Sequence, residues 1–225
     1  MPIRHPCAIV ALLDLLMPPA CASCGRSGAL MCPRCLNAFQ VASRPADRFL
    51  APDAGVVVGE SLSLAVAAFA HAGPMRRALA ALKYAGASRL APILARQAEP
   101  ALGRLLDLTG PAALVPVPVH IQRRRARGYN QAELLARQLG RLLQLPVADP
   151  LVRARPTTKQ HRLNRAARLQ NLQGAFAVSP ASAIPSTAIV VDDIITTTAT
   201  LEACASVLLN AGCQAVYGFA VAREV

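Results

Sequence analysis

The sequence contains no tryptophan, and aromatic residues make up only 4% of its 225 residues. A surface that binds nucleic acid by stacking bases on aromatic rings is therefore poorly supplied, and such binding would have to depend on charge. Long hydrophobic runs are also missing: the stretch that comes closest, residues 7–17, is interrupted by Asp14. Because a membrane-spanning helix needs about 20 apolar residues, we predict no membrane span, an amphipathic helix at 7–17 and a cytoplasmic protein.

Lysine is nearly absent as well, because Lys83 and Lys159 are the only lysines among 24 basic residues. Acidic residues number 12, so the net charge is +12, and between His120 and Gln170 basic residues exceed acidic ones by ten. The planar guanidinium group of arginine matches phosphate oxygens. This concentration predicts a phosphorylated small molecule or a nucleic-acid backbone as the partner. The alternative is a solvated basic surface without a ligand.

Four of the seven cysteines form two CxxC pairs separated by seven residues: Cys21, Cys24, Cys32 and Cys35. Two such pairs complete the tetrahedron of thiolates that structural Zn²⁺ prefers, and a full coordination sphere leaves no open position for catalysis. Gly25 permits the tight turn that such a knuckle needs. The alternative, two disulfides, requires export from the cytoplasm, which we do not expect. The sequence therefore predicts a zinc ribbon, with buried thiols at Cys7, Cys204 and Cys213.

The composition divides the chain into three parts: a helix and zinc ribbon at 1–40, a linker at 41–55 that contains Pro, Asp and Gly, and a larger domain at 56–225. In the larger domain, apolar runs predict strands at 61–71 and 112–120, the second with an exposed or irregular end because of its two prolines, and buried strands at 175–178, 188–191 and 215–222. Helical patterns alternate with them at 73–86, 88–108, 128–145 and 199–212. This order is typical of a doubly wound parallel sheet, an α/β fold.

Two polar, arginine-rich segments interrupt this pattern. Residues 121–127 are predicted to form a basic loop, and residues 153–174 a mobile loop that leads into a short helix. In the helix at 128–145, apolar residues at helical spacing predict a buried face that consists of Ala132, Leu135, Ala136, Leu139, Leu142 and Leu143.

The segment 189–200, IVVDDIITTTAT, carries the strongest indication of a ligand site. The apolar strand delivers Asp192 and Asp193 to its carboxyl end, the edge of an open α/β sheet where ligands bind. Four threonines precede the next helix, where hydroxyl and free N–H groups suit a phosphate: Thr196, Thr197, Thr198 and Thr200. The carboxylates suit the vicinal hydroxyls of a ribose, with a divalent metal ion nearby. The alternative, a turn rich in capping residues, explains one or two of the threonines.

This arrangement resembles the phosphoribosyl-pyrophosphate (PRPP) motif of type I phosphoribosyltransferases. One departure is Thr198, where those enzymes usually have glycine, and we expect a weaker or remodelled phosphate pocket. Together with the four-cysteine ribbon, the segments 82–86, 115–136 and 157–176 resemble the ComF/GntX family of competence-associated, phosphoribosyltransferase-like proteins. The resemblance spans nearly the whole chain. It implies a type I phosphoribosyltransferase fold fused to a zinc ribbon, linked in many bacteria to DNA uptake.

The resemblance also implies roles for individual residues. Asp192 and Asp193 would be the catalytic residues and bind the ribose, and the 5′-phosphate would be held by Thr196, Thr197, Thr198, Ala199 and Thr200. The pyrophosphate loop would consist of Pro116, Val117, Pro118, Val119 and His120. A flexible basic segment would close over the ligand with Lys159, Arg162 and Arg168, and Mg²⁺ would accompany PRPP.

Chemical reasoning adds further candidates. Negative charge accumulates on a leaving pyrophosphate, so the arginines beside the prolyl loop would stabilise it, although each is equally compatible with a solvated position: Arg123, Arg125 and Arg127. Lys83 suits either a phosphate contact or an ordinary surface position. His120 and His161 are candidate acid–base groups or hydrogen-bonding residues without a chemical role.

Two functions fit these observations. The first is an enzyme that transfers phosphoribosyl from PRPP to a nitrogen nucleophile. The second is a binding module that retains the PRPP pocket and uses its basic surface to hold single-stranded DNA or another protein of a DNA-uptake machinery. Only twenty-five residues follow Thr200, enough for one helix and one strand, so we expect any base-recognising hood to come from residues 40–75.

Overall fold

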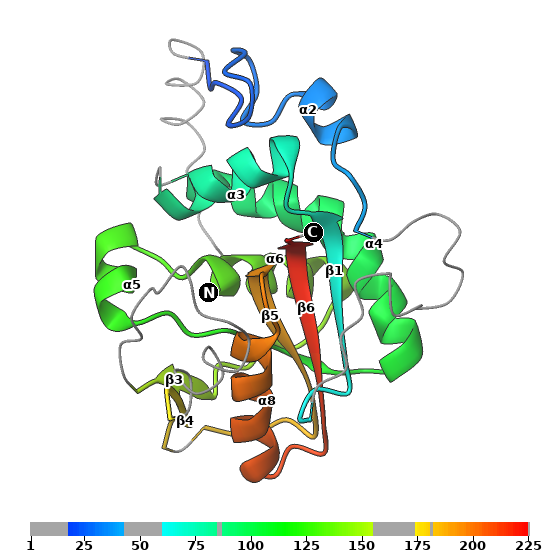
Figure 1. Ribbon diagram of the computed structural model, residues 1–225, viewed down its shortest axis with the longest axis vertical. Helices are drawn as coiled ribbons and strands as arrows, with labels where there is room; N and C mark the ends of the chain where they lie inside the picture. Colours follow the sequence, from blue (N-terminus) through cyan, green and yellow to red (C-terminus); the bar gives the residue numbers. More distant parts are fainter. Residues whose placement is uncertain (1–17, 43–59, 85–86, 155–173, 181, 225) are drawn as a thin grey trace.

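The computed structural model describes residues 18–42, 60–84, 87–154, 174–180 and 182–224. Its central sheet has four parallel strands in the order β1-β6-β5-β2 (Figure 1). Their bounds are β1 (Leu64–Ala70), β2 (Ala113–Pro116), β5 (Thr187–Ile195) and β6 (Ala215–Arg223). This arrangement confirms the predicted α/β fold with a parallel sheet. Among the described helices, none is both long and apolar enough to cross a membrane.

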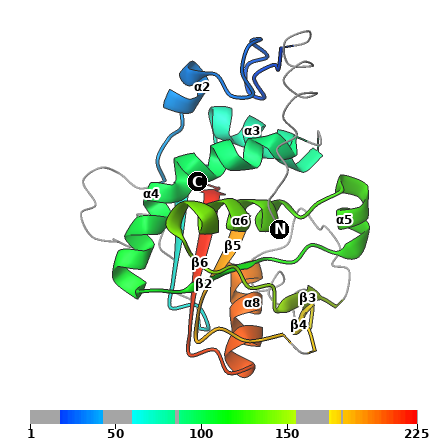
Figure 2. The same cartoon turned by 180° about the vertical axis from the view of Figure 1, so that it is seen from behind.

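Helices cover both faces of this sheet, as expected for strands that are apolar on both sides. One face is covered by α4 (Ala91–Thr109) and α6 (Gln131–Leu143), and the other by α8 (Ala199–Asn210) (Figures 1 and 2). A 3₁₀ turn, η2 (Ser88–Leu90), leads into α4. The helix α3 (Gly73–Tyr84) lies beside the carboxyl end of the sheet, so its side chains can reach that edge.

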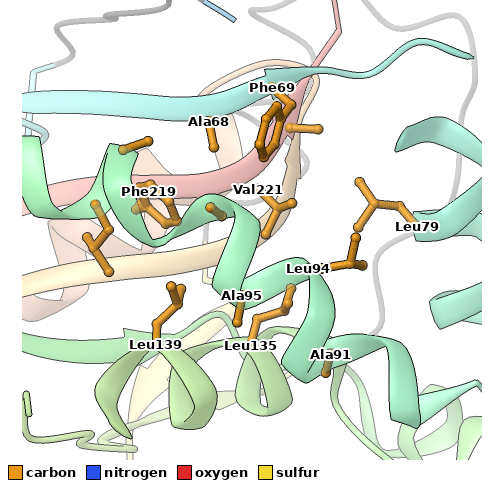
Figure 3. Packing of buried hydrophobic residues seen from close by; sticks show 14 of the residues in the cluster. Ala68, Phe69, Leu79, Ala91, Leu94, Ala95, Leu135, Leu139, Phe219 and Val221 are labelled. Atoms are coloured by element: carbon orange, nitrogen blue, oxygen red, sulfur yellow. The ribbon is translucent and has the colours of Figure 1, made fainter. Parts of the chain in front are cut away.

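The side chains of each strand alternate between two hydrophobic clusters, because successive residues of a strand point to opposite faces. Val66 and Ala68 of β1 pack in the cluster beneath α3, α4 and α6, whereas Ala65 and Ala67 pack on the side of α8. Figure 3 shows the first cluster, in which Phe219 and Val221 of the sheet lie against residues of α4 and α6. These buried layers hold the strand ends in place.

Helix α8 packs unusually close to strand β6. A Cβ atom at Gly218 would lie 2.9 Å from Leu201 Cδ1 and 3.0 Å from Ala65 Cβ, so a larger residue there would require the Leu201 side chain to shift. The helical spacing of 199–212 predicts an inward face of Leu201, Cys204, Ala205, Leu208 and Leu209; the first four are buried, whereas Leu209 is only partly buried. Gly212, with φ +102°, follows the helix.

The structure corrects four details of the prediction. Residues 121–127 form a helix, α5 (Ile121–Arg127), and not a loop, because the His120 side chain accepts a hydrogen bond from Gln122 N and Gly128 ends the helix in the left-handed region. The run at 175–178 belongs to β4 (Phe176–Val178), which pairs antiparallel with β3 (Leu151–Arg153) in a separate two-stranded sheet. Leu142 is 42% exposed and not buried.

The fourth correction concerns strand β5, which is longer than predicted. It continues through Ile194 and Ile195, because both residues pair with β6. The acid pair therefore lies within the strand and not after it.

The chain that follows the cysteine segment adds to the edge of the sheet. Ala42 N donates to Ala68 O at 3.1 Å, and Ala70 N donates to Gln40 O at 2.8 Å. The Phe39 and Phe69 rings lie 5.3 Å apart in a tilted arrangement. The Phe69 side chain is therefore part of the packed core. The predicted helix at 7–17, Cys7 and most of the predicted linker at 41–55 lie outside the described residues.

Candidate functional sites

The four N-terminal cysteines gather into one cluster. Their sulfur atoms all lie within 4.8 Å of one another, and Cys24 Sγ and Cys32 Sγ are 3.7 Å apart. A tetrahedral zinc ion with Zn–S distances of about 2.3 Å brings its sulfurs to about 3.8 Å, so the cluster fits a metal ion such as Zn²⁺. None of the cysteines that the structure describes forms a disulfide.

Local backbone geometry shapes the first knuckle. Gly25 adopts φ +76°, and its N–H donates to Cys21 O at 2.8 Å. Cys32 N donates to Cys21 Sγ at 3.4 Å, which links the two knuckles, and Cys32 caps the short helix α2 (Pro33–Asn37). Three of the four ligands are buried, whereas Cys24 is exposed. This closed arrangement is the one expected for a structural metal.

A second site lies at the carboxyl edge of the parallel sheet. A pocket of about 610 Å³ opens there, and every strand of the sheet contributes to its lining through its carboxyl end or the residues that follow. Open α/β sheets bind ligands at this edge. Of the predicted site residues, it brings together Lys83, Val117, Pro118, Val119, Arg123, Arg127, Asp192, Asp193, Thr196 and Thr200.

Both acids of the pair line this pocket, and Asp193 forms an ion pair with a lysine. Lys83 Nζ is 2.6 Å from Asp193 Oδ2, and Asp193 is 3% exposed. Asp192 Oδ1 accepts a hydrogen bond from Asp193 N at 2.8 Å. Burial raises the pKa of Asp192 well above its ordinary value and Asp193 raises it further, whereas Lys83 opposes the rise.

The threonine segment turns from β5 into α8. Thr196 is exposed and lines the pocket, whereas Thr200 lines it from the first turn of the helix and not from the loop. Thr198 is 5% exposed and has φ −68°, a right-handed conformation in which threonine is unstrained. The backbone therefore does not require the glycine that is usual at this position.

Three of the arginines that line the pocket come from elements that follow β2 in the chain. Arg123 and Arg127 come from α5, and Arg153 comes from β3. Arg127 lies over the Tyr84 ring and Arg153 over the Phe176 ring, each at 5.3 Å from the ring centroid. Burial, with the nearby charge of Arg123, lowers the pKa of Arg153. Guanidinium groups in the lining of a pocket suit a ligand with several phosphate oxygens.

Asn130 holds the prolyl loop at the start of α6. Its Nδ2 donates to Val117 O at 2.9 Å, and its Oδ1 accepts from Ala132 N at 3.0 Å. The side chain is 6% exposed. It therefore caps the helix and fixes one wall of the pocket at the same time.

The structure adds pocket residues that sequence reasoning missed: His71, Arg76, Tyr84, Gln131, Arg153 and Glu224. His71 and Glu224 follow the carboxyl ends of β1 and β6, so the rule that ligands bind at this edge was a usable signal for both. Burial lowers the pKa of His71, although Glu224 opposes the change. The basic concentration between His120 and Gln170 includes Arg153, but nothing in the sequence distinguishes it from the other arginines of that region.

Other predicted residues do not line the pocket: Thr197, Thr198, Ala199, Pro116, His120 and Arg125. Arg125 is exposed on α5, and His120 caps that helix. Lys159, Arg162, Arg168 and His161 lie outside the described residues.

Comparison with known proteins identifies the relatives of this chain. No family model matches it. It is 30% identical to DNA utilization protein YhgH of Escherichia coli over 162 residues, which are 69% of this chain and 70% of that protein. It is 38% identical to competence protein F of Haemophilus influenzae over 123 residues, and 38% identical to competence protein ComFC of Bacillus subtilis over 99 residues.

The fold and the two sites define an α/β protein with a pocket at its sheet edge and a four-cysteine cluster that could hold a metal ion such as zinc. With these relatives, the chain belongs to the ComF family. The matches cover 54% of competence protein F and 39% of ComFC, so the chain aligns with about half the length of these competence proteins or less.

Proposed function

We propose that the pocket binds PRPP or a related ribose 5-phosphate ligand. The observation that carries this proposal is a pocket whose lining combines the carboxylates of Asp192 and Asp193, two threonines at the turn from β5 into α8, and arginines from α3, α5 and β3. A sugar that bears phosphates at both ends needs acceptors for its hydroxyls between two anion sites. The arrangement of charges matches this requirement.

In this proposal, Asp192 accepts hydrogen bonds from the ribose hydroxyls. The backbone N–H of Asp193 donates to Asp192 Oδ1 and so holds the Asp192 carboxyl in position. The 5′-phosphate lies at the first turn of α8, where Thr196 and Thr200 offer hydroxyl groups and the helix dipole favours an anion. The pyrophosphate meets Arg123 and Arg153 at the opposite end.

The proposal extends to phosphoribosyl transfer. The bond between C1′ and the pyrophosphate oxygen breaks, a bond from C1′ to a nitrogen nucleophile forms, and the nitrogen loses a proton. Charge accumulates on the departing pyrophosphate, and preorganised guanidinium groups stabilise such charge. A release assay for pyrophosphate with a panel of nitrogen nucleophiles tests this step, and PRPP that binds without any release contradicts it.

We also infer a role in DNA uptake or utilisation, which the relatives' names suggest: two are competence proteins and one is a DNA utilization protein. Deletion of the gene from a naturally competent host tests this role. We expect transformation frequency to fall and to recover with the wild-type gene, and an unchanged frequency contradicts the role.

Calorimetric titration of PRPP into the protein with Mg²⁺ in the buffer tests the pocket. We expect binding by the wild type and at least a tenfold loss, about 1.4 kcal/mol, in the double variant Asp192→Asn, Asp193→Asn. Asp107→Asn is the matched control, because Asp107 is an exposed carboxylate on α4 away from the pocket. Equal affinities in the wild type and the double variant contradict the proposal.

A second candidate function is electrostatic binding of single-stranded DNA. Helix α5 carries Arg124 and Arg125 on its exposed side, outside the pocket, and Arg124 contacts Glu133 at 3.4 Å. This side continues the charge of the pocket arginines onto the surface. Binding to a phosphate backbone releases counterions, so it weakens steeply as salt rises.

Fluorescence anisotropy with labelled single-stranded DNA at two salt concentrations tests this candidate. We expect Arg124→Gln, Arg125→Gln to weaken DNA binding and to reduce its dependence on salt, while PRPP binding stays unchanged. An affinity that depends on neither salt nor these arginines contradicts it.

A further inference from the structure

The contact between Lys83 and the acid pair defines how the pocket is charged. Lys83 Nζ lies 2.6 Å from Asp193 Oδ2, and the two side chains are 19% and 4% exposed. Lys83 therefore does not extend into solvent as an ordinary surface lysine does. It points into the pocket and pairs with the more buried of the two carboxylates.

The backbone around Lys83 is held in place. The preceding residue, Leu82, is fully buried, and its carbonyl oxygen accepts a hydrogen bond from Tyr129 Oη at 2.5 Å. Arg76, Ala80 and Lys83 share one face of α3, and all three line the pocket. The position of the ammonium group thus follows from the packing of the whole helix.

The residues around the acid pair do not fit a divalent cation there, although the resemblance implies Mg²⁺ with PRPP. Mg²⁺ requires near-octahedral oxygen ligands at about 2.0–2.1 Å, and an ammonium group already occupies the approach to Asp193 Oδ2. Five cationic side chains line the pocket, Arg76, Lys83, Arg123, Arg127 and Arg153, against three carboxylates, Asp192, Asp193 and Glu224. A divalent cation would add to an existing positive excess.

We propose that Lys83 is the resident cation of the acid pair, so that this pocket binds its phosphorylated sugar without a divalent metal ion. Lys83 neutralises Asp193 and leaves Asp192 to accept the sugar hydroxyls, while the arginines meet the phosphates. The inference rests on the proposed function for the identity of the ligand, but its metal requirement is a separate property. Lys83 is a specificity-determining residue that replaces the metal.

Titration of PRPP with and without Mg²⁺ tests the first consequence. The buffer is passed over a chelating resin, and elemental analysis verifies that zinc stays bound to the cysteine cluster. We expect the wild-type affinity to change by less than about twofold when excess Mg²⁺ is added. We expect Lys83→Met, which keeps the aliphatic stem, to bind at least about tenfold more tightly with Mg²⁺ than without it.

Arg77→Met is the matched control. Arg77 lies on the same helix, but it donates to Ser23 Oγ at 3.1 Å and does not line the pocket. We expect this variant to behave as the wild type does. Wild-type binding that requires Mg²⁺ overturns the inference and leaves the proposed function standing. Loss of affinity in Lys83→Met that Mg²⁺ does not restore also overturns it, because Lys83 would then be a direct phosphate ligand.

A measurement without PRPP keeps the inference testable if the proposed function fails. Electron paramagnetic resonance with Mn²⁺ alone reports whether the acid pair binds a divalent cation. We expect no site in the wild type, a new site in Lys83→Met, and its loss when Asp192→Asn and Asp193→Asn are added. A wild-type Mn²⁺ site that these two substitutions abolish overturns the inference.

Discussion

The cysteine cluster and the pocket border the same helix, α3, but they are built in different ways. All four sulfur ligands come from residues 21–35, whereas the pocket lining extends from His71 to Glu224. The cluster needs two turns that bring its sulfur atoms together, whereas the pocket needs the complete sheet and the helices around it. A local site can therefore be lost without the pocket, whereas the pocket depends on the whole fold.

Helix α3 connects the two regions through different faces. Its buried face, which includes Leu79 and Leu82, packs in the same hydrophobic cluster as Met31 of the cysteine segment. Arg77 bonds to Ser23 on one side, while Lys83 reaches the acid pair on another. We therefore expect loss of the metal to disturb α3 first and the distant strands least.

Metal removal gives the largest expected effect. Structural zinc contributes about 10–16 kcal/mol of apparent folding free energy in small zinc domains. We expect a strong chelator, or Cys24→Ser, to abolish hydrogen-exchange protection in residues 18–42 while β5 and β6 stay protected. Cys213→Ser is the control, because Cys213 is a thiol outside the cluster. Simultaneous loss of protection in the strands would mean that the two regions do not fold separately.

Asn130→Ala is expected to have the next largest effect, because it removes a helix cap and leaves Val117 O without its partner. We expect a loss of about 2 kcal/mol in the free energy of unfolding, measured with urea. PRPP affinity should fall as well, because Val117, Pro118 and Val119, which line the pocket, lose the hydrogen bond from Asn130 that holds them in place. Asn130→Asp keeps the capping oxygen and should recover part of the stability. Equal stability of Asn130→Ala and wild type contradicts this account.

The ionisation of Asp192 is expected to have a smaller effect on stability. The folded state raises the pKa of Asp192 and so favours its protonated form. The contribution of this protonated carboxyl to the free energy of unfolding is therefore complete below the ordinary aspartate pKa of about 3.9. It is lost as the pH rises through the higher folded value. We expect the free energy of unfolding to fall less over this window in Asp192→Asn than in wild type.

Urea unfolding at a series of pH values measures this difference, with Asp107→Asn as the exposed control. If the free energy of unfolding of Asp192→Asn depends on pH as that of the wild type does, then ionisation of the buried Asp192 carboxyl does not cause this dependence.

Arg125→Gln gives the smallest expected effect on the pocket. Arg125 is exposed and does not line the pocket, so PRPP affinity should change by less than about twofold. Arg153→Gln is the comparison, because Arg153 lines the pocket beside Arg123, and we expect at least about a tenfold loss. Calorimetry of both variants checks this contrast. Equal losses of PRPP affinity would contradict the assignment of Arg153 to the pocket and of Arg125 to the surface outside it.

Much of the fold could be predicted from the sequence because its strands are apolar on both faces and its helices have periodic apolar positions. Helix α5 could not, since four arginines in seven residues leave no apolar face, and only the His120 cap and Gly128 define its ends. The helical spacing predicts that Leu142 is buried, but no other part of the described structure covers it and its side chain is exposed.

The sequence alone determined the cysteine cluster, because short-range backbone geometry sets the distances within it, and it located the acid and threonine segment, although not which of its threonines line the pocket. Tertiary structure decided which cations surround the acid pair. Lys83 and Arg153 are 70 residues apart, and their meeting at one pocket depends on strand order, helix rotation and core packing. Many weak contacts together set these three properties, and the residues that make the contacts are spread over the whole sequence.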